Sequence, residues 1–110
     1  VPRDPIKALM AVRESKGRFV AVTDQEILDA LGILAKSTGV FGEPAAAASL
    51  AGVLRLSRDG VLKPEESIVV VITGNGLKDI KNAMKATGSP HVIRPDIGEL
   101  DRMIREIGEP

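Results

Sequence analysis

The sequence has no cysteine, tryptophan or tyrosine, and two phenylalanines are its only aromatic residues. The absence of cysteine excludes disulfides and thiolate metal sites, and leaves the redox compartment undetermined. Because Phe19 and Phe41 are the only aromatic side chains, a hydrophobic core must be built from valine, isoleucine, leucine and alanine.

An excess of charge of one sign is also missing, since 15 basic and 15 acidic residues balance to a formal net charge of zero. The basic residues are dispersed among acids, so the sequence favours no nucleic acid or other polyanionic partner. No apolar run reaches the ~20 residues that span a bilayer, and no signal-peptide pattern opens the chain. We therefore expect a soluble, cytoplasmic protein with no membrane partner, and its 110 residues fit a single domain, 1–110.

Residues 68–72 (IVVVI) are five β-branched apolar residues in succession. Such a run is typical of a strand that is buried on both faces inside a parallel sheet. The run ends in Thr73 and a loop with two glycines, Gly74 and Gly76, and α/β sheets bind their ligands at this end of a strand. The sequence therefore predicts a ligand site close to Thr73.

Helix-start and helix-stop signals alternate with the strand-like segments. Asp4 is an N-cap residue for a helix that we expect to end at Gly17, and Thr23 with Glu26 forms a capping box for a helix that Gly39 ends. We predict helices over residues 5–16, 24–38, 44–58, 77–86 and 97–107, and strands over 18–22, 68–72 and 91–93. This alternation predicts an α/β fold of three layers, with a parallel sheet between two layers of helices.

Two motifs carry a resemblance to a known family: GEPAAAAS at residues 42–49 and TGNGLKD at residues 73–79. In their order and separation, the sequence resembles the threonine synthase family, which are pyridoxal-phosphate enzymes of the tryptophan-synthase-like fold type II. The resemblance implies a Rossmann-like segment from the C-terminal part of the large, cofactor-binding domain. Asn75 departs from the pattern, since many relatives have histidine there, and so does Ile80, where proline is frequent.

The resemblance implies a role in cofactor binding for four residues. The hydroxyl of Thr73 would hydrogen-bond the pyridine nitrogen of pyridoxal phosphate, Gly74 and Gly76 would let the backbone approach the ring, and Glu43 would lie beside the ring and help to position it. Each residue also has a purely structural interpretation. Threonine is a good strand residue, glycines form ordinary turns, and a carboxylate at a helix N-terminus is favoured by the helix dipole.

The resemblance places no catalytic residue in this segment. In the family, the lysine that carries the cofactor as a Schiff base lies far upstream, as does the loop that binds the cofactor phosphate. We interpret Lys78 as a solvated or ion-paired side chain, and His91 as structural, because one histidine builds neither a metal site nor a triad. We expect this segment to be inactive alone, with the remainder of the same enzyme chain as its partner and a small amino-acid substrate bound by a homodimer.

For the whole enzyme, the resemblance implies conversion of O-phospho-L-homoserine and water to L-threonine and phosphate. Three alternatives stay open: a related threonine or serine deaminase, a non-catalytic homologue that keeps the fold as a binding module, and a free-standing small-ligand α/β domain. The first residue is Val1 rather than methionine, which a cut from a longer polypeptide would explain.

Overall fold

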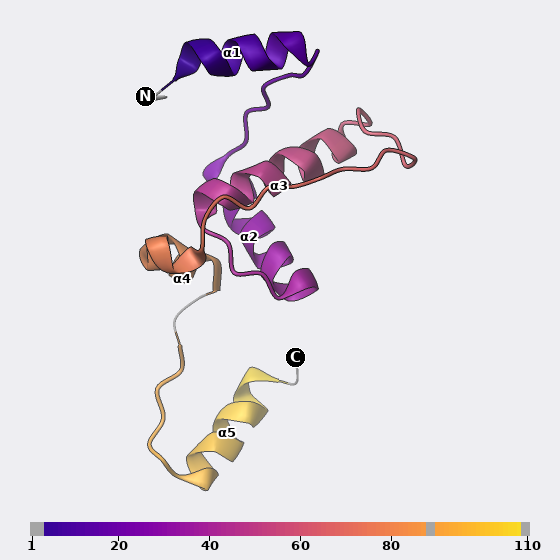
Figure 1. The fold of residues 1–110 in the computed structure, drawn as a ribbon. Helices are drawn as coiled ribbons and strands as arrows, with labels where there is room; N and C mark the ends of the chain where they lie inside the picture. Colours follow the sequence, from indigo (N-terminus) through magenta and orange to yellow (C-terminus); the bar gives the residue numbers. More distant parts are fainter. Residues whose placement is uncertain (1–3, 88–89, 109–110) are drawn as a thin grey trace.

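The computed structural model describes residues 4–87 and 90–108 (Figure 1). The elements in this part of the chain are all helical. They are α1 (Pro5–Glu14), α2 (Asp24–Thr38), α3 (Pro44–Arg58), the 3-10 helix η1 (Gly76–Asp79), α4 (Ile80–Thr87) and α5 (Ile97–Ile107). None of these helices is both long and apolar enough to cross a lipid bilayer.

The predicted helix starts after Asp4, Thr23 and Asp96 are confirmed, and each is stabilised by a short-range hydrogen bond of the capping side chain. The Asp4 carboxylate accepts from the Lys7 N–H at 3.2 Å, and the Asp96 carboxylate caps α5 in the same way. At the start of α2 the Thr23 hydroxyl accepts from the Glu26 N–H, and the Glu26 carboxylate accepts from the Thr23 N–H at 2.8 Å. Both halves of the predicted capping box are therefore formed.

The helix ends follow the sequence with one exception. Gly39 ends α2 in the left-handed conformation, with φ of 73°, and Gly60 has φ of 67° just beyond α3. The end of α1 was predicted at Gly17, but the left-handed residue is Lys16, with φ of 55°. The Gly17 N–H still donates to the Val12 carbonyl at 2.8 Å, so the chain forms a Schellman-type turn with its glycine one position too late.

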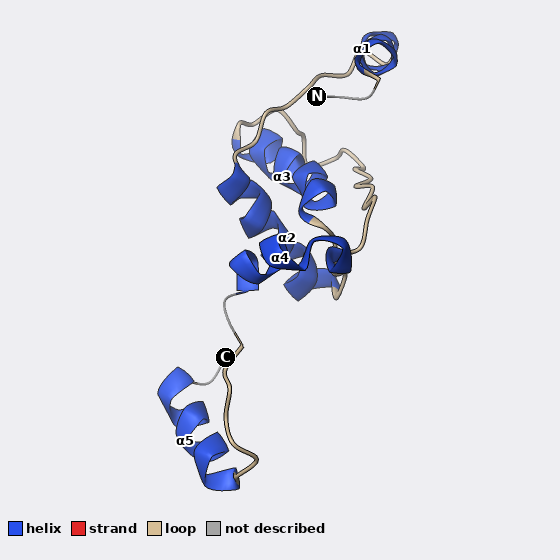
Figure 2. Cartoon of the chain, turned by 90° about the vertical axis from the view of Figure 1, so that its left-hand side faces the viewer, coloured by secondary structure: helices blue, strands red, loops and turns tan. Residues whose placement is uncertain are grey.

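The predicted strands are not formed within the described residues, as Figure 2 shows. Segments 18–22, 68–72 and 91–93 are loops, so the strand predictions are wrong here and the three-layer parallel sheet is not confirmed. The physical reason is that a strand needs the backbone of a neighbour. In this part of the chain the β-type pairing that is found is a single antiparallel bridge between Gly42 and Asn75.

The packed centre of the molecule consists of α2 against α3, with α4 beside α2. Small side chains let α2 and α3 approach closely, so alanine supplies most of the buried positions. The buried apolar residues are Ala30, Leu31 and Leu34 of α2, Ala46, Ala47 and Ala51 of α3, and Ala83 of α4. An ion-pair cluster ties the same two helices together, since Glu26 of α2 lies 3.4 Å from Arg55 and 2.8 Å from Arg58 of α3.

Helices α1 and α5 project from this centre toward opposite ends of the molecule (Figures 1 and 2). Neither helix contains a buried residue. The apolar stripe of α5 is exposed along its whole length, from Ile97 to Ile107. The candidate site must therefore be sought around α2, α3 and the turn that leads into α4.

Candidate functional site

The two sequence motifs meet at one place in the structure. The Glu43 N–H donates to the Gly74 carbonyl at 2.9 Å, and the Gly76 N–H donates to the Phe41 carbonyl at 2.9 Å. These bonds flank the bridge between Gly42 and Asn75. The start of the GEPAAAAS motif is thereby joined, backbone to backbone, to the turn of the TGNGLKD motif.

Helix α3 positions one side of this junction. Its first residue is Pro44, which suits the first helical position because its missing N–H needs no partner there. Glu43 is the N-cap residue, as predicted, and its carbonyl accepts from the N–H groups of Ala46 and Ala47, both at 2.9 Å. Segment 68–72 runs back along the helix, where the Ser49 hydroxyl lies 3.4 Å from the Val71 carbonyl oxygen. The turn that follows segment 68–72 therefore lies at the N-terminus of α3.

The Glu43 carboxylate forms an ion pair with Lys78. The Lys78 Nζ lies 3.0 Å from one carboxylate oxygen and 3.2 Å from the other. The Glu43 side chain is only 14% exposed, whereas that of Lys78 is 64% exposed. The interpretation of Lys78 as a solvated or ion-paired side chain is confirmed, since Lys78 is both exposed and ion-paired. The Glu43 side chain makes no capping hydrogen bond, so its carboxylate is not held by the amides of α3.

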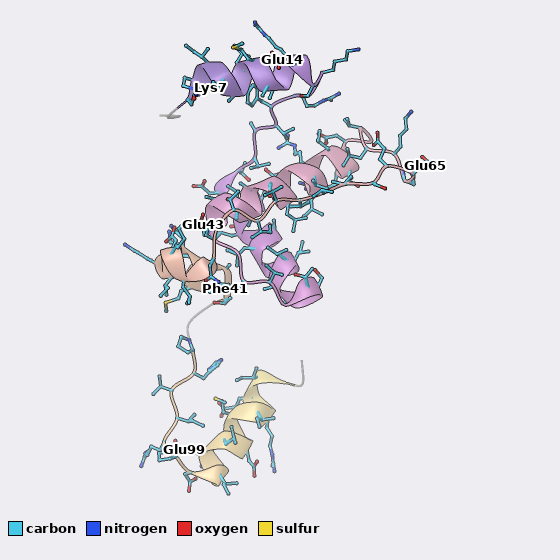
Figure 3. All side chains as sticks on the ribbon, in the orientation of Figure 1. Lys7, Glu14, Phe41, Glu43, Glu65 and Glu99 are labelled. Atoms are coloured by element: carbon cyan, nitrogen blue, oxygen red, sulfur yellow. The ribbon has the colours of Figure 1, made fainter. Side chains whose placement is uncertain are left out.

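Gly74 and Gly76 are sites of close approach rather than of unusual backbone conformation. A Cβ at Gly74 would overlap the Glu43 carboxylate, and a Cβ at Gly76 would overlap the ring of Phe41. Figure 3 labels Glu43 and Phe41 at this junction. The flat ring that lies against Gly76 is thus a side chain of the protein, and this contact was not predicted from the sequence. Its only signal was the position of Phe41 next to the GEPAAAAS motif.

Asn75 has a structural role that the sequence left open. Its side-chain oxygen accepts from the Leu77 N–H at 2.9 Å, and its carbonyl accepts from the Lys78 N–H at 3.1 Å. Asn75 therefore caps η1, which carries Lys78. The predicted helix over 77–86 begins with this 3-10 turn and then continues as α4.

Asp79 marks the transition from η1 to α4. Its carboxylate accepts from the Asn82 side-chain amide at 2.8 Å and from the Asn82 N–H at 3.3 Å. These two bonds lower the pKa of Asp79, and the Coulomb attraction of Lys85 and Lys81 acts in the same direction. The carboxylate therefore caps a helix, and an anionic group bound at this helix end would have to approach a negative charge.

Thr73 lies next to the junction, directly before Gly74, and its side chain is exposed. Within residues 4–87 and 90–108 its hydroxyl has no hydrogen-bond partner. A hydroxyl both donates and accepts, so it is chemically suited to an aromatic ring nitrogen. The structure thus places Glu43 against Gly74 and Phe41 against Gly76, and Thr73 directly precedes this turn in the chain.

Other candidate groups lie elsewhere. His91 is exposed on the loop before α5, so it makes no packing contribution to a core. No group of acidic or histidine side chains in the described ranges could hold a metal ion. A groove of about 330 Å³ lies between α2 and α3, and none of the predicted site residues lines it.

The chain is similar to a known protein family and to individual proteins. A family model described as pyridoxal-phosphate dependent enzyme matches residues 1–74. The threonine synthase of Methanocaldococcus jannaschii is 42% identical over 106 residues, which are 96% of this chain and 26% of that protein. Threonine synthases of Mycobacterium leprae and of a Bacillus species are 48% and 50% identical over 76% and 66% of this chain, and over 23% and 20% of their own lengths. The chain thus spans about a quarter or less of these relatives.

Proposed function

Because the chain belongs to the pyridoxal-phosphate-dependent enzymes, we propose that it is a segment of the large domain of a threonine synthase. The enzyme would be a cytoplasmic lyase that converts O-phospho-L-homoserine and water to L-threonine and phosphate. The observation that carries this proposal is the backbone junction of the two family motifs, from the Glu43 N–H to the Gly74 carbonyl.

The segment would form one wall of the cofactor pocket. Pyridoxal phosphate, when bound, supplies an electron sink for bonds at the substrate's α carbon. The Thr73 hydroxyl would donate to the ring nitrogen, which a neutral donor leaves unprotonated, whereas a carboxylate would keep it protonated. A weaker electron sink suits elimination and replacement at the side-chain carbons. The fit is supported by the exposed Thr73 hydroxyl, which has no partner among the described residues.

Glu43 would lie beside the cofactor ring, and Gly74 and Gly76 would keep the turn compact. This role is supported by the contacts of the two glycines. Gly74 lies against the Glu43 carboxylate, and Gly76 lies against the Phe41 ring. A side chain at either glycine would displace one of these groups.

The remainder of the enzyme chain would complete the fold and the site. It would provide the cofactor lysine and the phosphate-binding loop, together with strands that pair with segments 18–22, 68–72 and 91–93 in a three-layer parallel sheet. The proposed pairing of segment 68–72 is supported by its exposed apolar side chains, since Val69 is 86% and Val71 is 65% exposed. The complete enzyme would be a homodimer.

The test is an assay of the full-length protein with two amino acids. With O-phospho-L-homoserine we expect equal amounts of phosphate and L-threonine to be formed. With L-threonine alone we expect no release of ammonia. Ammonia release from threonine without phosphate release from phosphohomoserine would identify a deaminase instead, and no turnover of either would favour a non-catalytic module.

A further inference from the structure

Lys78 is the one cation that contacts a predicted cofactor-binding residue in the described part of the chain. We propose that Lys78 is a positioning residue: through its ion pair it holds the Glu43 carboxylate over the backbone of Gly74 and so fixes the turn that carries Thr73. The expected effect of Lys78 on catalysis rests on the proposed function. Its effect on the conformation of the turn does not, and can be tested separately.

The first argument is that Glu43 is attached to the turn at two points. Its backbone N–H donates to the Gly74 carbonyl at 2.9 Å, and both carboxylate oxygens lie within 3.2 Å of the Lys78 Nζ. Lys78 is itself fixed to the turn, because its N–H donates to the Asn75 carbonyl at 3.1 Å. Residues 74–78 and Glu43 therefore form a closed loop of contacts that connects segments 35 positions apart in the sequence.

The second argument is that the carboxylate has an alternative position. As the N-cap residue of α3, Glu43 stands where a carboxylate is attracted by the free amides of the helix end. The side chain makes no such capping bond and lies instead against Gly74, where a Cβ would overlap it. Since Lys78 is the partner found in the observed position, its ammonium group selects this position over the helix end.

The third argument is burial. The Glu43 side chain is 14% exposed, so the loss of Lys78 would leave a largely buried carboxylate without its counterion. Such a carboxylate moves toward other donors or toward solvent, because a buried unpaired charge is unfavourable. We therefore expect that removal of the ammonium group displaces the carboxylate and loosens the turn, with Thr73 in it.

The experiment compares three variants of the full-length protein. Lys78→Met removes the charge and keeps most of the side-chain volume, and Lys78→Arg restores a cation. Lys81→Met is the matched control, because Lys81 is exposed on α4 and acts on Asp79 only through the Coulomb interaction. In the cofactor-free protein, hydrogen exchange is measured at the amides of Glu43 and Gly76, which donate across the junction.

We expect Lys78→Met to speed hydrogen exchange at both amides by about two- to fivefold, which is the size of effect that loss of a partly exposed ion pair produces. Lys78→Arg should restore most of the protection, and Lys81→Met should not change it. In a double variant with Glu43→Gln, the added Lys78→Met should have little further effect, because the pair is already broken. The proposal would be overturned if Lys78→Met left the exchange rates of the two amides unchanged. It would also be overturned if these amides exchanged as fast in Lys78→Arg as in Lys78→Met.

The catalytic consequence is read separately in the cofactor-loaded enzyme. Lys78→Met should lower kcat by about ten- to hundredfold with a smaller change in KM, and should alter the absorbance of the bound cofactor. Lys78→Arg should recover most of both. If exchange responds as expected but wild-type protein does not convert phosphohomoserine, the proposed function fails and the positioning role stands. If wild-type protein is active and kcat is unaffected by Lys78→Met, the positioning role in catalysis fails alone.

Discussion

Thr73 is the residue on which the proposed chemistry depends most, because it combines an exposed hydroxyl with a place next to the Glu43–Gly74 junction. Valine has nearly the shape of threonine but no hydroxyl, so Thr73→Val in the full-length enzyme removes the hydrogen bond with little steric change. In the complete enzyme, a ring nitrogen left without its donor would cost about 1–3 kcal/mol, so we expect kcat to fall by about 5- to 150-fold.

The control for this prediction is Thr73→Ser, which keeps the hydroxyl and should keep most of the activity. The absorbance spectrum of the bound cofactor should shift in Thr73→Val and not in Thr73→Ser. An undiminished kcat in Thr73→Val would remove Thr73 from the cofactor site.

Gly76 allows a second prediction at the residue scale. Gly76→Ala places a methyl group within the ring of Phe41, and overpacking of this kind costs about 1–3 kcal/mol. We expect a lower midpoint of thermal unfolding in the full-length protein, and partial recovery when Phe41→Leu is added to it. The matched control is Gly52→Ala in α3, where a Cβ would meet nothing within 4 Å. Because alanine favours a helix by ~1 kcal/mol over glycine, the control should be neutral or stabilising.

At the scale of the element, Glu26 connects the start of α2 to α3. Its carboxylate accepts from the Thr23 N–H, which is the main cause of its lowered pKa, and burial opposes this effect. The Thr23 hydroxyl, Arg58 and Arg55 lower the pKa further. Since the folded state holds the charged form, the stabilisation by Glu26 is complete above the ordinary glutamate pKa of about 4.3. It is lost as the pH falls through the lower pKa of the folded state.

We therefore expect the thermal unfolding midpoint of the wild-type protein to fall more steeply below about pH 4.3 than that of Glu26→Gln. The glutamine variant should be less stable at neutral pH, because it lacks the ion pairs to Arg55 and Arg58. Glu65→Gln is the control, since Glu65 lies on the exposed loop after α3 (Figure 3). Parallel pH curves for wild type and Glu26→Gln would contradict the assigned role.

The elements also show which features the sequence can predict. The caps at Asp4, Thr23 and Asp96 involve residues three positions apart, so they follow from local sequence alone. The helix predicted over residues 5–16 ends at Glu14, because the left-handed turn that stops it is formed at Lys16, before Gly17. The strands depend on partners distant in sequence, which a pattern of valines and isoleucines does not supply.

In the candidate site, too, some features follow from the local sequence and others depend on contacts between distant segments. The two motifs, and the prediction that Lys78 is solvated or ion-paired, could be obtained from the sequence. The partner of Lys78 and the contact of Phe41 with Gly76 could not, because both connect segments that are adjacent only once the chain has folded. The resemblance to threonine synthases directs attention to Gly74 and Gly76, and the structure shows that a Cβ at either position would overlap a neighbouring side chain.

At the scale of the whole molecule, the described shape is far from that of a compact domain. The radius of gyration is 18.4 Å, whereas a compact chain of this length has about 13 Å. The accessible surface is 8979 Å², about half as much again as the roughly 5,800 Å² expected for a folded monomer of this mass. The excess includes apolar side chains that would be covered in a complete enzyme, among them Ile6, Val69, Val92 and Ile97.

This excess leads to a prediction for residues 1–110 produced as a separate polypeptide. Exposed apolar surface of this extent favours association, so we expect the polypeptide to self-associate at micromolar concentration and to bind a hydrophobic dye such as ANS. It should release no phosphate from O-phospho-L-homoserine, because the family's cofactor lysine is expected outside it. Analytical ultracentrifugation and a phosphate assay measure the two outcomes.

A monodisperse, dye-free monomer with a radius of gyration near 13 Å in small-angle scattering would mean that the chain folds by itself. Phosphate release by that monomer would mean that the active site lies within these 110 residues, and both the segment interpretation and the assignment of the cofactor lysine to the rest of the enzyme would then be wrong.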